Sequence, residues 1–133
     1  MPNTANLTIS LNYLGPDNNV VEMPPKLVAC AYDAQAHGTV DVPDATAAAT
    51  TIPVPFGGIS VDATCGYVEN NSGQALLVDV NGTGDAFALP NGGVFPWGFP
   101  GSSSTPVLSI DLTTTAVQSG LGKITYHLFG DPA

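Results

Sequence analysis

A two-residue hydrophobic period runs through most of this 133-residue chain. Apolar and polar side chains alternate in four long stretches, at residues 7–13, 59–67, 108–112 and 124–128. In the first stretch the apolar positions are Leu7, Ile9, Leu11 and Tyr13, and polar residues separate them. Successive side chains of a strand point to opposite faces, so the alternation predicts half-buried β-strands with one solvated face. No segment keeps helical spacing over three turns, because Pro or Gly interrupts most long windows.

Shorter strands are predicted between turn-forming residues, at 27–32, 39–42, 75–80, 86–89 and 94–97. Three connections read as tight hairpins, at 70–73, 81–84 and 90–93, because Asn and Gly accept the positive φ of such turns. Roughly eight or nine short strands at this spacing predict an all-β fold, an antiparallel sandwich or barrel. The length fits one domain that spans residues 1–133.

Residues 33–58 depart from this pattern and predict a long irregular excursion. The segment contains Pro43, Pro53, Pro55 and Gly57, and it has few large apolar side chains before Ile52. A connection of this length is usually functional or mobile. It either packs against something outside its own core or is a surface loop with one short strand at 39–42. The first interpretation makes five residues candidate partner contacts, namely Ala45, Thr46, Thr50, Ile52 and Phe56.

A second candidate contact surface is the aromatic segment that contains Phe95, Trp97 and Phe99. Exposed aromatic rings here would stack on sugar rings or anchor a protein partner. The structural alternative is that Trp97 closes one end of the sandwich with the two phenylalanines on either side, since Trp is usually well buried.

The charge balance excludes several classes of partner. Lys26 and Lys123 are the only cations against eleven carboxylates, which gives a formal net charge of −9. Such a chain cannot neutralise the phosphates of a nucleic acid or bind an anionic membrane surface. It also has no apolar run long enough to predict a membrane span. Its surface must consist largely of small uncharged side chains, which are desolvated at low cost and suit repeated contacts in an assembly.

Cys30 and Cys65 are the only cysteines. The first residues show no basic and apolar segments of a secretion signal, so synthesis in the cytosol with reduced thiols is expected. Two buried thiols are therefore favoured over a disulfide.

No motif predicts an enzyme, a metal site or a cofactor. The loop at 79–85 places oxygens at alternate positions, but Pro90 stands where a calcium-binding EF-hand loop needs its twelfth-position Glu. His37 and His127 lack the spacing of zinc ligands, and no G-x-S-x-G motif is present. A hairpin turn explains residues 79–85 with fewer assumptions.

The second half of the chain nevertheless has a recognisable pattern. It runs through Gly66–Gln74, Gly84–Pro90, Thr113–Ala116, Ser119–Gly122 and Ile124–Asp131. This pattern resembles small all-β virion proteins of tailed bacteriophages, especially capsid decoration (cement) proteins. The resemblance covers about half of the chain, and it carries over no individual residue as a site.

The resemblance implies a β-sandwich of jelly-roll type that binds the outer surface of a capsid and reinforces the contacts between capsomers. It implies the major capsid protein and the chain itself as partners, with a trimer favoured, and location in the virion after synthesis in the host cytoplasm. The alternatives are a tail or fibre accessory module, which could bind host glycans through the aromatic segment, and a small secreted or surface carbohydrate-binding domain.

Overall fold

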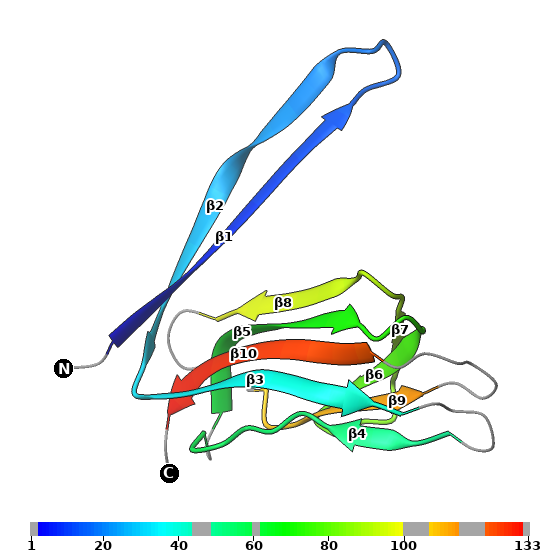
Figure 1. The fold of residues 1–133 in the computed structure, drawn as a ribbon. Coiled ribbons are helices and arrows are strands. Elements are labelled where there is room, and N and C mark those ends of the chain that lie inside the picture. Colours follow the sequence, from blue (N-terminus) through cyan, green and yellow to red (C-terminus); the bar gives the residue numbers. More distant parts are fainter. Residues whose placement is uncertain (1–2, 44–48, 60–61, 100–106, 115–121, 132–133) are drawn as a thin grey trace.

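The computed structural model describes residues 3–43, 49–59, 62–99, 107–114 and 122–131. These residues form ten antiparallel strands in three sheets (Figure 1). None of the described residues belongs to a helix, so none of them provides a helical membrane span. The strands are β1 (Asn3–Leu14), β2 (Val20–Tyr32), β3 (Ala34–Val42), β4 (Thr51–Pro53), β5 (Asp62–Asn71), β6 (Leu76–Val80), β7 (Phe87–Leu89), β8 (Val94–Gly98), β9 (Ile110–Thr114) and β10 (Gly122–Asp131).

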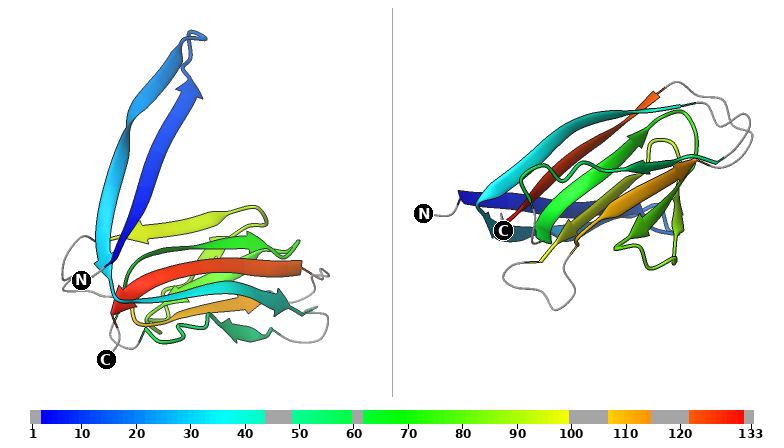
Figure 2. Two further views of the ribbon diagram at one scale, coloured as in Figure 1. Left: turned by 60° about the vertical axis from the view of Figure 1, so that its left-hand side comes forward. Right: turned by 90° about the horizontal axis from the view of Figure 1, so that it is seen from below.

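Strands β3 to β10 form two four-stranded sheets that pack face to face (Figures 1 and 2). The first sheet has the order β3-β10-β5-β8 and the second the order β4-β9-β6-β7. Their pairs are nested along the chain: β3 with β10, β4 with β9, β5 with β8 and β6 with β7. The pairs β5–β10 and β6–β9 then complete the two sheets. The predicted all-β, antiparallel fold is confirmed.

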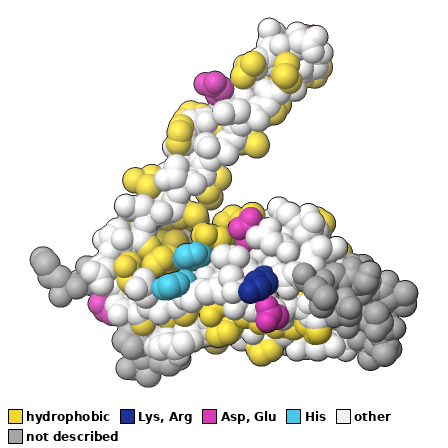
Figure 3. All heavy atoms as spheres, viewed as in Figure 1, with side chains coloured by type: hydrophobic (Ala, Val, Ile, Leu, Met, Phe, Trp, Pro, Cys, Tyr) yellow, Lys and Arg dark blue, Asp and Glu magenta, His cyan; other side chains and the backbone are white. Residues whose placement is uncertain are grey.

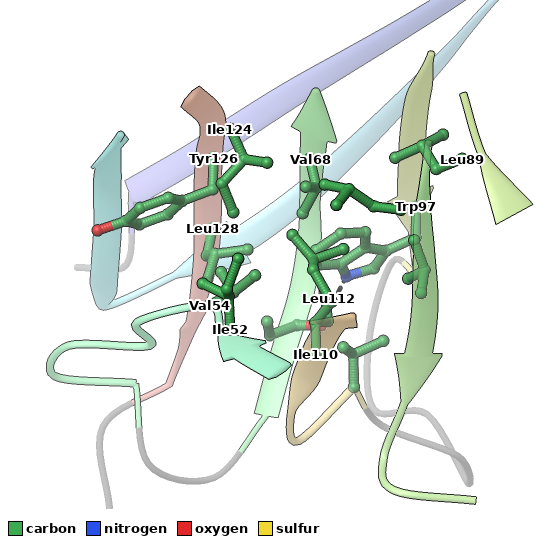
Figure 4. Close-up of a cluster of buried hydrophobic side chains, with 14 of the residues drawn as sticks. Ile52, Val54, Val68, Leu89, Trp97, Ile110, Leu112, Ile124, Tyr126 and Leu128 are labelled. Atoms are coloured by element: carbon green, nitrogen blue, oxygen red, sulfur yellow. Dashed lines mark hydrogen bonds between the residues drawn. The ribbon is translucent and has the colours of Figure 1, made fainter. Parts of the chain in front are cut away.

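The core lies between these two sheets, where one face of each strand supplies the apolar side chains (Figure 4). The alternation along β10 is clear, because Ile124, Tyr126 and Leu128 are buried and their neighbours are more exposed. Trp97 lies in the same core, and its Nε1–H donates a hydrogen bond to the Ala63 carbonyl at 2.9 Å. A buried indole needs such an acceptor, and this one fixes the ring in the core.

The predicted excursion at 33–58 is wrong where the segment forms strands, at residues 34–42 and 51–53, whereas the short strand predicted at 39–42 is confirmed as part of the first of them. Its first part is the nine-residue strand β3 at the edge of the first sheet, and Thr51–Pro53 is the short strand β4. The inward positions of β3 include Ala34, Ala36 and Gly38, and a Cβ added to Gly38 would lie 3.1 Å from the Tyr126 hydroxyl. Small residues are needed beside that ring, so the first part of β3 lacks the large apolar side chains that mark a strand in the sequence, whereas its second part has Val40 and Val42.

Two of the three predicted hairpins are also corrected. Residues 81–84 do connect the paired strands β6 and β7, with Asn81 and Gly82 at positive φ. The segments 70–73 and 90–93 instead carry the chain from one sheet to the other. The buried side chain of Asn70 holds both crossings, because its Nδ2 donates to the carbonyls of Gln74 and Leu89, each at 2.8 Å. The Asn70 side chain therefore forms a buried hydrogen-bond network with these two carbonyls at the ends of the sheets.

The third sheet is the β1–β2 hairpin, which projects away from the packed sheets (Figures 1 and 2). We call residues 3–32 the arm. The strands predicted at 7–13 and 27–32 are confirmed, and they are longer than predicted. Their predicted burial is wrong, because most of the arm is exposed.

Candidate interaction surface

The arm has one face on which apolar side chains from both strands lie together. The register pairs Ala5 with Cys30, Leu7 with Val28, Leu11 with Met23 and Tyr13 with Val21. Directly paired residues of an antiparallel ladder point to the same side, and alternate residues of one strand do as well. The apolar face therefore comprises Ala5, Leu7, Ile9, Leu11, Tyr13, Val21, Met23, Val28 and Cys30, with Lys26 opposite Ile9.

A register shift in the middle of the arm keeps this face continuous. Two residue steps on β1, from Ile9 to Leu11, face three steps on β2, from Lys26 to Met23. The extra residue falls at Pro24 and Pro25, which have no N–H to donate to the ladder. This bulge leaves Met23, an odd-numbered residue, on the same face as the even-numbered Val28.

The proximal half of the apolar face packs on the two-sheet body. Ala5 and Cys30 are buried with Cys65 of β5, and Leu7 and Val28 lie against this cluster. The fit is close, because a Cβ added to Gly98 of β8 would meet Val28 at 3.0 Å and Leu7 at 3.2 Å.

Two further contacts of β2 and the residue after it fix the base of the arm. The Tyr32 ring meets Phe129 edge-on, with ring centroids 4.9 Å apart. The backbone N–H of Asp33 donates to the Gly130 carbonyl at 3.0 Å. The arm is therefore attached to the body through its first strand pairs, and its direction is set there.

The two cysteines meet at this attachment point, as free and buried thiols. Cys30 Sγ lies 3.9 Å from the Thr64 carbonyl oxygen. Burial, and then the neighbouring Cys30 with its side-chain hydrogen bond, raise the pKa of Cys65 from 9.0 to about 12. The predicted burial of both thiols is confirmed, and a thiol that keeps its proton is a poor nucleophile.

The distal half of the apolar face is bare. Ile9, Leu11, Tyr13 and Met23 are 48–52% exposed, and hydrophobic side chains are visible along the arm (Figure 3). An isolated two-stranded hairpin is marginally stable in water, so a bare apolar face on one is costly. Exposed apolar patches of this kind mark interaction sites.

A cleft continues the bare face toward the body. It has a volume of about 450 Å³ and lies between Leu7–Ser10 of the arm and the outer side of β5 and β8. Val94 and Pro96 are the apolar residues on the β8 wall, and both are exposed. The apolar surface thus extends from the arm onto the outer side of the first sheet.

The outer side of the first sheet also carries a row of stacked rings. The ring centroids of Tyr67 and His127 are 5.1 Å apart, and those of His127 and His37 are 5.7 Å apart. The three residues are cross-strand neighbours on β5, β10 and β3. Because each ring stacks on the next, the row rigidifies the sheet.

The residues predicted as contacts in segment 33–58 do not form one surface. Ala45 and Thr46 lie outside the described residues. Thr50 is exposed and exchanges hydrogen bonds with Thr114 at the end of β9. Ile52 is buried between the sheets and Phe56 packs against the core, so neither is a surface contact in this structure.

The aromatic segment is divided between core and surface. Trp97 is 6% exposed, which agrees with its interpretation as a core residue and contradicts its use as a surface contact. Phe95 packs against the core beside it, with ring centroids 5.6 Å apart. Phe99 remains 38% exposed. The three rings therefore do not form an exposed platform.

The loop at 79–85 is a hydrogen-bonded turn. The Asp79 carboxylate accepts hydrogen bonds from the Gly84 N–H, at 3.2 Å, and from the Thr83 hydroxyl, at 3.4 Å. Within the described ranges no three His, Cys, Asp or Glu residues cluster as metal ligands.

The strongest candidate surface, the bare half of the arm, was not predicted as a site. Its signal in the sequence is the alternation at residues 7–13, which predicts a half-buried strand of the sandwich but does not say that another molecule covers the strand.

Comparison of the chain with protein-family models, curated proteins and solved structures gave no match.

Proposed function

We propose that this chain is a structural, non-enzymatic protein of a tailed-phage virion that binds the outer capsid surface and reinforces contacts between capsomers. The projecting arm, whose apolar face is only half covered, is the observation that carries the proposal. A chain that acted alone would gain stability by covering this face. Its exposure is explained if the working state is an assembly.

The arrangement of the two sheets supports the proposal. In the body the first strand pairs with the last, the second with the second-last, and so on inward. Such a chain is a long hairpin rolled into two layers. We infer that β3–β10 form a jelly roll, an architecture used by viral capsid and lectin domains. The architecture hosts many functions, so it supports an assembly role without specifying one.

Those residues of the resemblance that the structure describes lie in this rolled body. Gly66–Asn71 belongs to β5, Phe87–Leu89 is β7, and Ile124–Asp131 belongs to β10. The resemblance therefore concerns the body, whereas the arm is an addition to it. The body would present the chain on the capsid and the arm would reach a neighbour.

Charge is consistent with contacts between proteins. Nine of the eleven carboxylates lie outside the arm, together with one of the two lysines. A body with this charge is repelled by nucleic acid, which leaves proteins, glycans or small ligands as its partners. Small uncharged residues at the contacts would be desolvated at little cost.

A tail or fibre module that binds host glycans is the second candidate function. It depended on exposed rings in the aromatic segment, and the structure argues against that exposure. Sugar stacking needs exposed ring faces, but Trp97 is buried and hydrogen-bonded to Ala63. Only Phe99 of the aromatic segment is left with substantial exposure.

Quantitative mass spectrometry of purified virions tests the proposal. Hundreds of copies per particle, in a fixed ratio to the major coat subunit, would support capsid decoration. A dozen or fewer would move the chain to the tail or fibre, and none would refute a virion role.

Particles assembled without the gene provide an independent test. They should release DNA at a lower temperature than wild-type particles, and purified chain added afterwards should restore the difference. Equal heat stability of both particles would contradict a reinforcing role.

A further inference from the structure

We infer that the distal apolar face of the arm binds the same face of a second copy of this chain. The face is formed by Ile9, Leu11 and Tyr13 of β1 with Val21 and Met23 of β2. This inference goes beyond capsid binding, because it concerns the purified chain alone. It shares the arm with the proposed function but requires no coat protein.

The sequence indicates that this face is normally covered. Residues 7–13 alternate strictly between apolar and polar side chains, which is typical of a strand with one buried side. Among the described residues, cover is found at the proximal positions alone, where Cys65 and its neighbours lie. Leu11 and Tyr13 continue the same alternation at 52% and 50% exposure. No described residue covers them, so we infer that their cover comes from a second copy.

The amount of bare apolar surface fits one protein partner. Four residues of the distal face, Ile9, Leu11, Tyr13 and Met23, are about half exposed, and their uncovered area sums to roughly 400 Å² at about 200 Å² for a fully exposed large side chain. A standard interface buries about 800 Å² per partner, of which about 57% is apolar. The distal face therefore supplies close to the whole apolar part of one such interface.

The chain itself offers a surface complementary to this face. A flat, two-stranded apolar face packs best against another flat apolar layer, about 10 Å away. The distal face of a second arm is such a layer, and one contact covers both copies. Self-complementary patches of this kind give two-fold dimers, which are the commonest protein oligomers.

Charge favours contact through the arms over contact through the bodies. The arm carries only Asp17, Glu22 and Lys26, whereas the other nine carboxylates lie in the rest of the chain. Contact between the arm tips keeps the acidic bodies apart. Lys26 is the one charged residue on the apolar face, and it lies opposite Ile9, at the end of the distal face that is nearest the body.

The arm provides a matched control on its opposite face. Leu14, Val20 and Leu27 are 58–66% exposed and pair with each other or with Thr8, so they point away from the apolar face. The test variant is L11T/Y13T/M23T and the control is L14T/V20T/L27T. Threonine keeps β-propensity in both, so the arm should still form.

Light scattering coupled to size-exclusion chromatography, with no other protein present, gives the test. Wild-type chain should have the mass of a dimer, twice the 13.5 kDa of one chain. The test variant should run as a monomer, with a dissociation constant raised about 100-fold or more, and the control should stay within about threefold of wild type. Raising NaCl to 0.5 M should not dissociate the wild-type oligomer, since the contact is apolar.

Each remaining outcome is decisive. A monomeric wild type at about 100 µM, or equal dissociation of both triple variants, would overturn the inference. So would a monomeric wild type that binds capsids through Leu11, which would assign the face to a coat protein and leave the proposed function intact. Thermal unfolding followed by the fluorescence of Trp97 checks that the body folds in every variant, and L11T against L27T repeats the comparison with single substitutions.

Discussion

Replacement of Trp97 by alanine should destabilise the two-sheet body strongly. The side chain is 6% exposed and its Nε1 donates to the Ala63 carbonyl at 2.9 Å. Truncation of a buried Trp to Ala costs about 3–5 kcal/mol, which includes the cavity. With an unfolding entropy of roughly 2.1 cal/mol/K per residue over 133 residues, a loss of about 4 kcal/mol lowers Tm by about 14 °C.

Far-UV circular dichroism is the appropriate assay, because Trp97 is the only tryptophan and its fluorescence is lost on substitution. Wild type and variants are compared at one chain concentration, since association shifts Tm. Phe99→Ala, in the same segment but 38% exposed, is the control and should cost about 1 kcal/mol or less.

Trp97→Phe retains an aromatic ring without the donor and should lie between the two alanine variants. A Tm change of less than about 2 °C for Trp97→Ala, together with a loss of sugar binding, would refute the assignment of this residue to the core.

Three further outcomes are expected. Gly66→Ala should cost about 1–3 kcal/mol or more, because the added Cβ would lie 2.5 Å from the His127 carbonyl oxygen, whereas Gly58→Ala, with no atom within 4 Å, should be nearly neutral in urea unfolding. The free energy of unfolding should fall as pH rises from 9.0 toward 12, because the unfolded Cys65 thiol ionises while the folded thiol, with its raised pKa, keeps its proton. Cys65→Ala should remove this pH dependence, and an unchanged slope would contradict the raised pKa of Cys65. Iodoacetamide should label Cys65 in the native chain at pH 8 far more slowly than in urea, and equal rates would contradict its burial.

The sequence predicted strands best where apolar side chains are large and alternate. The stretch at 124–128 is a strand in the middle of a sheet, and every second side chain of it is buried. Residues 39–42 were predicted as a strand, but the first half of β3 escaped prediction because its inward residues are small, and Gly38 leaves room beside Tyr126. Hydrophobic periodicity detects inward positions that hold large apolar side chains. It does not detect inward positions that must stay small to leave space for a neighbouring side chain.

Alternation also does not say which molecule covers a face. Leu7 and Leu11 occupy equivalent positions in one apolar stripe, yet Leu7 packs on the body and Leu11 is 52% exposed. Local sequence fixes the stripe, whereas the direction of the arm depends on contacts at its base, such as Tyr32 with Phe129. These contacts join residues far apart in sequence, so local patterns could not predict the arm as a site.

Cryo-electron microscopy of the virion tests the central claim most directly. The account predicts this chain on the outer capsid surface between capsomers, with Leu11 and Tyr13 of each arm packed against the arm of another copy. Density that places the chain in the tail, or that leaves the distal face of the arm in solvent, would contradict it.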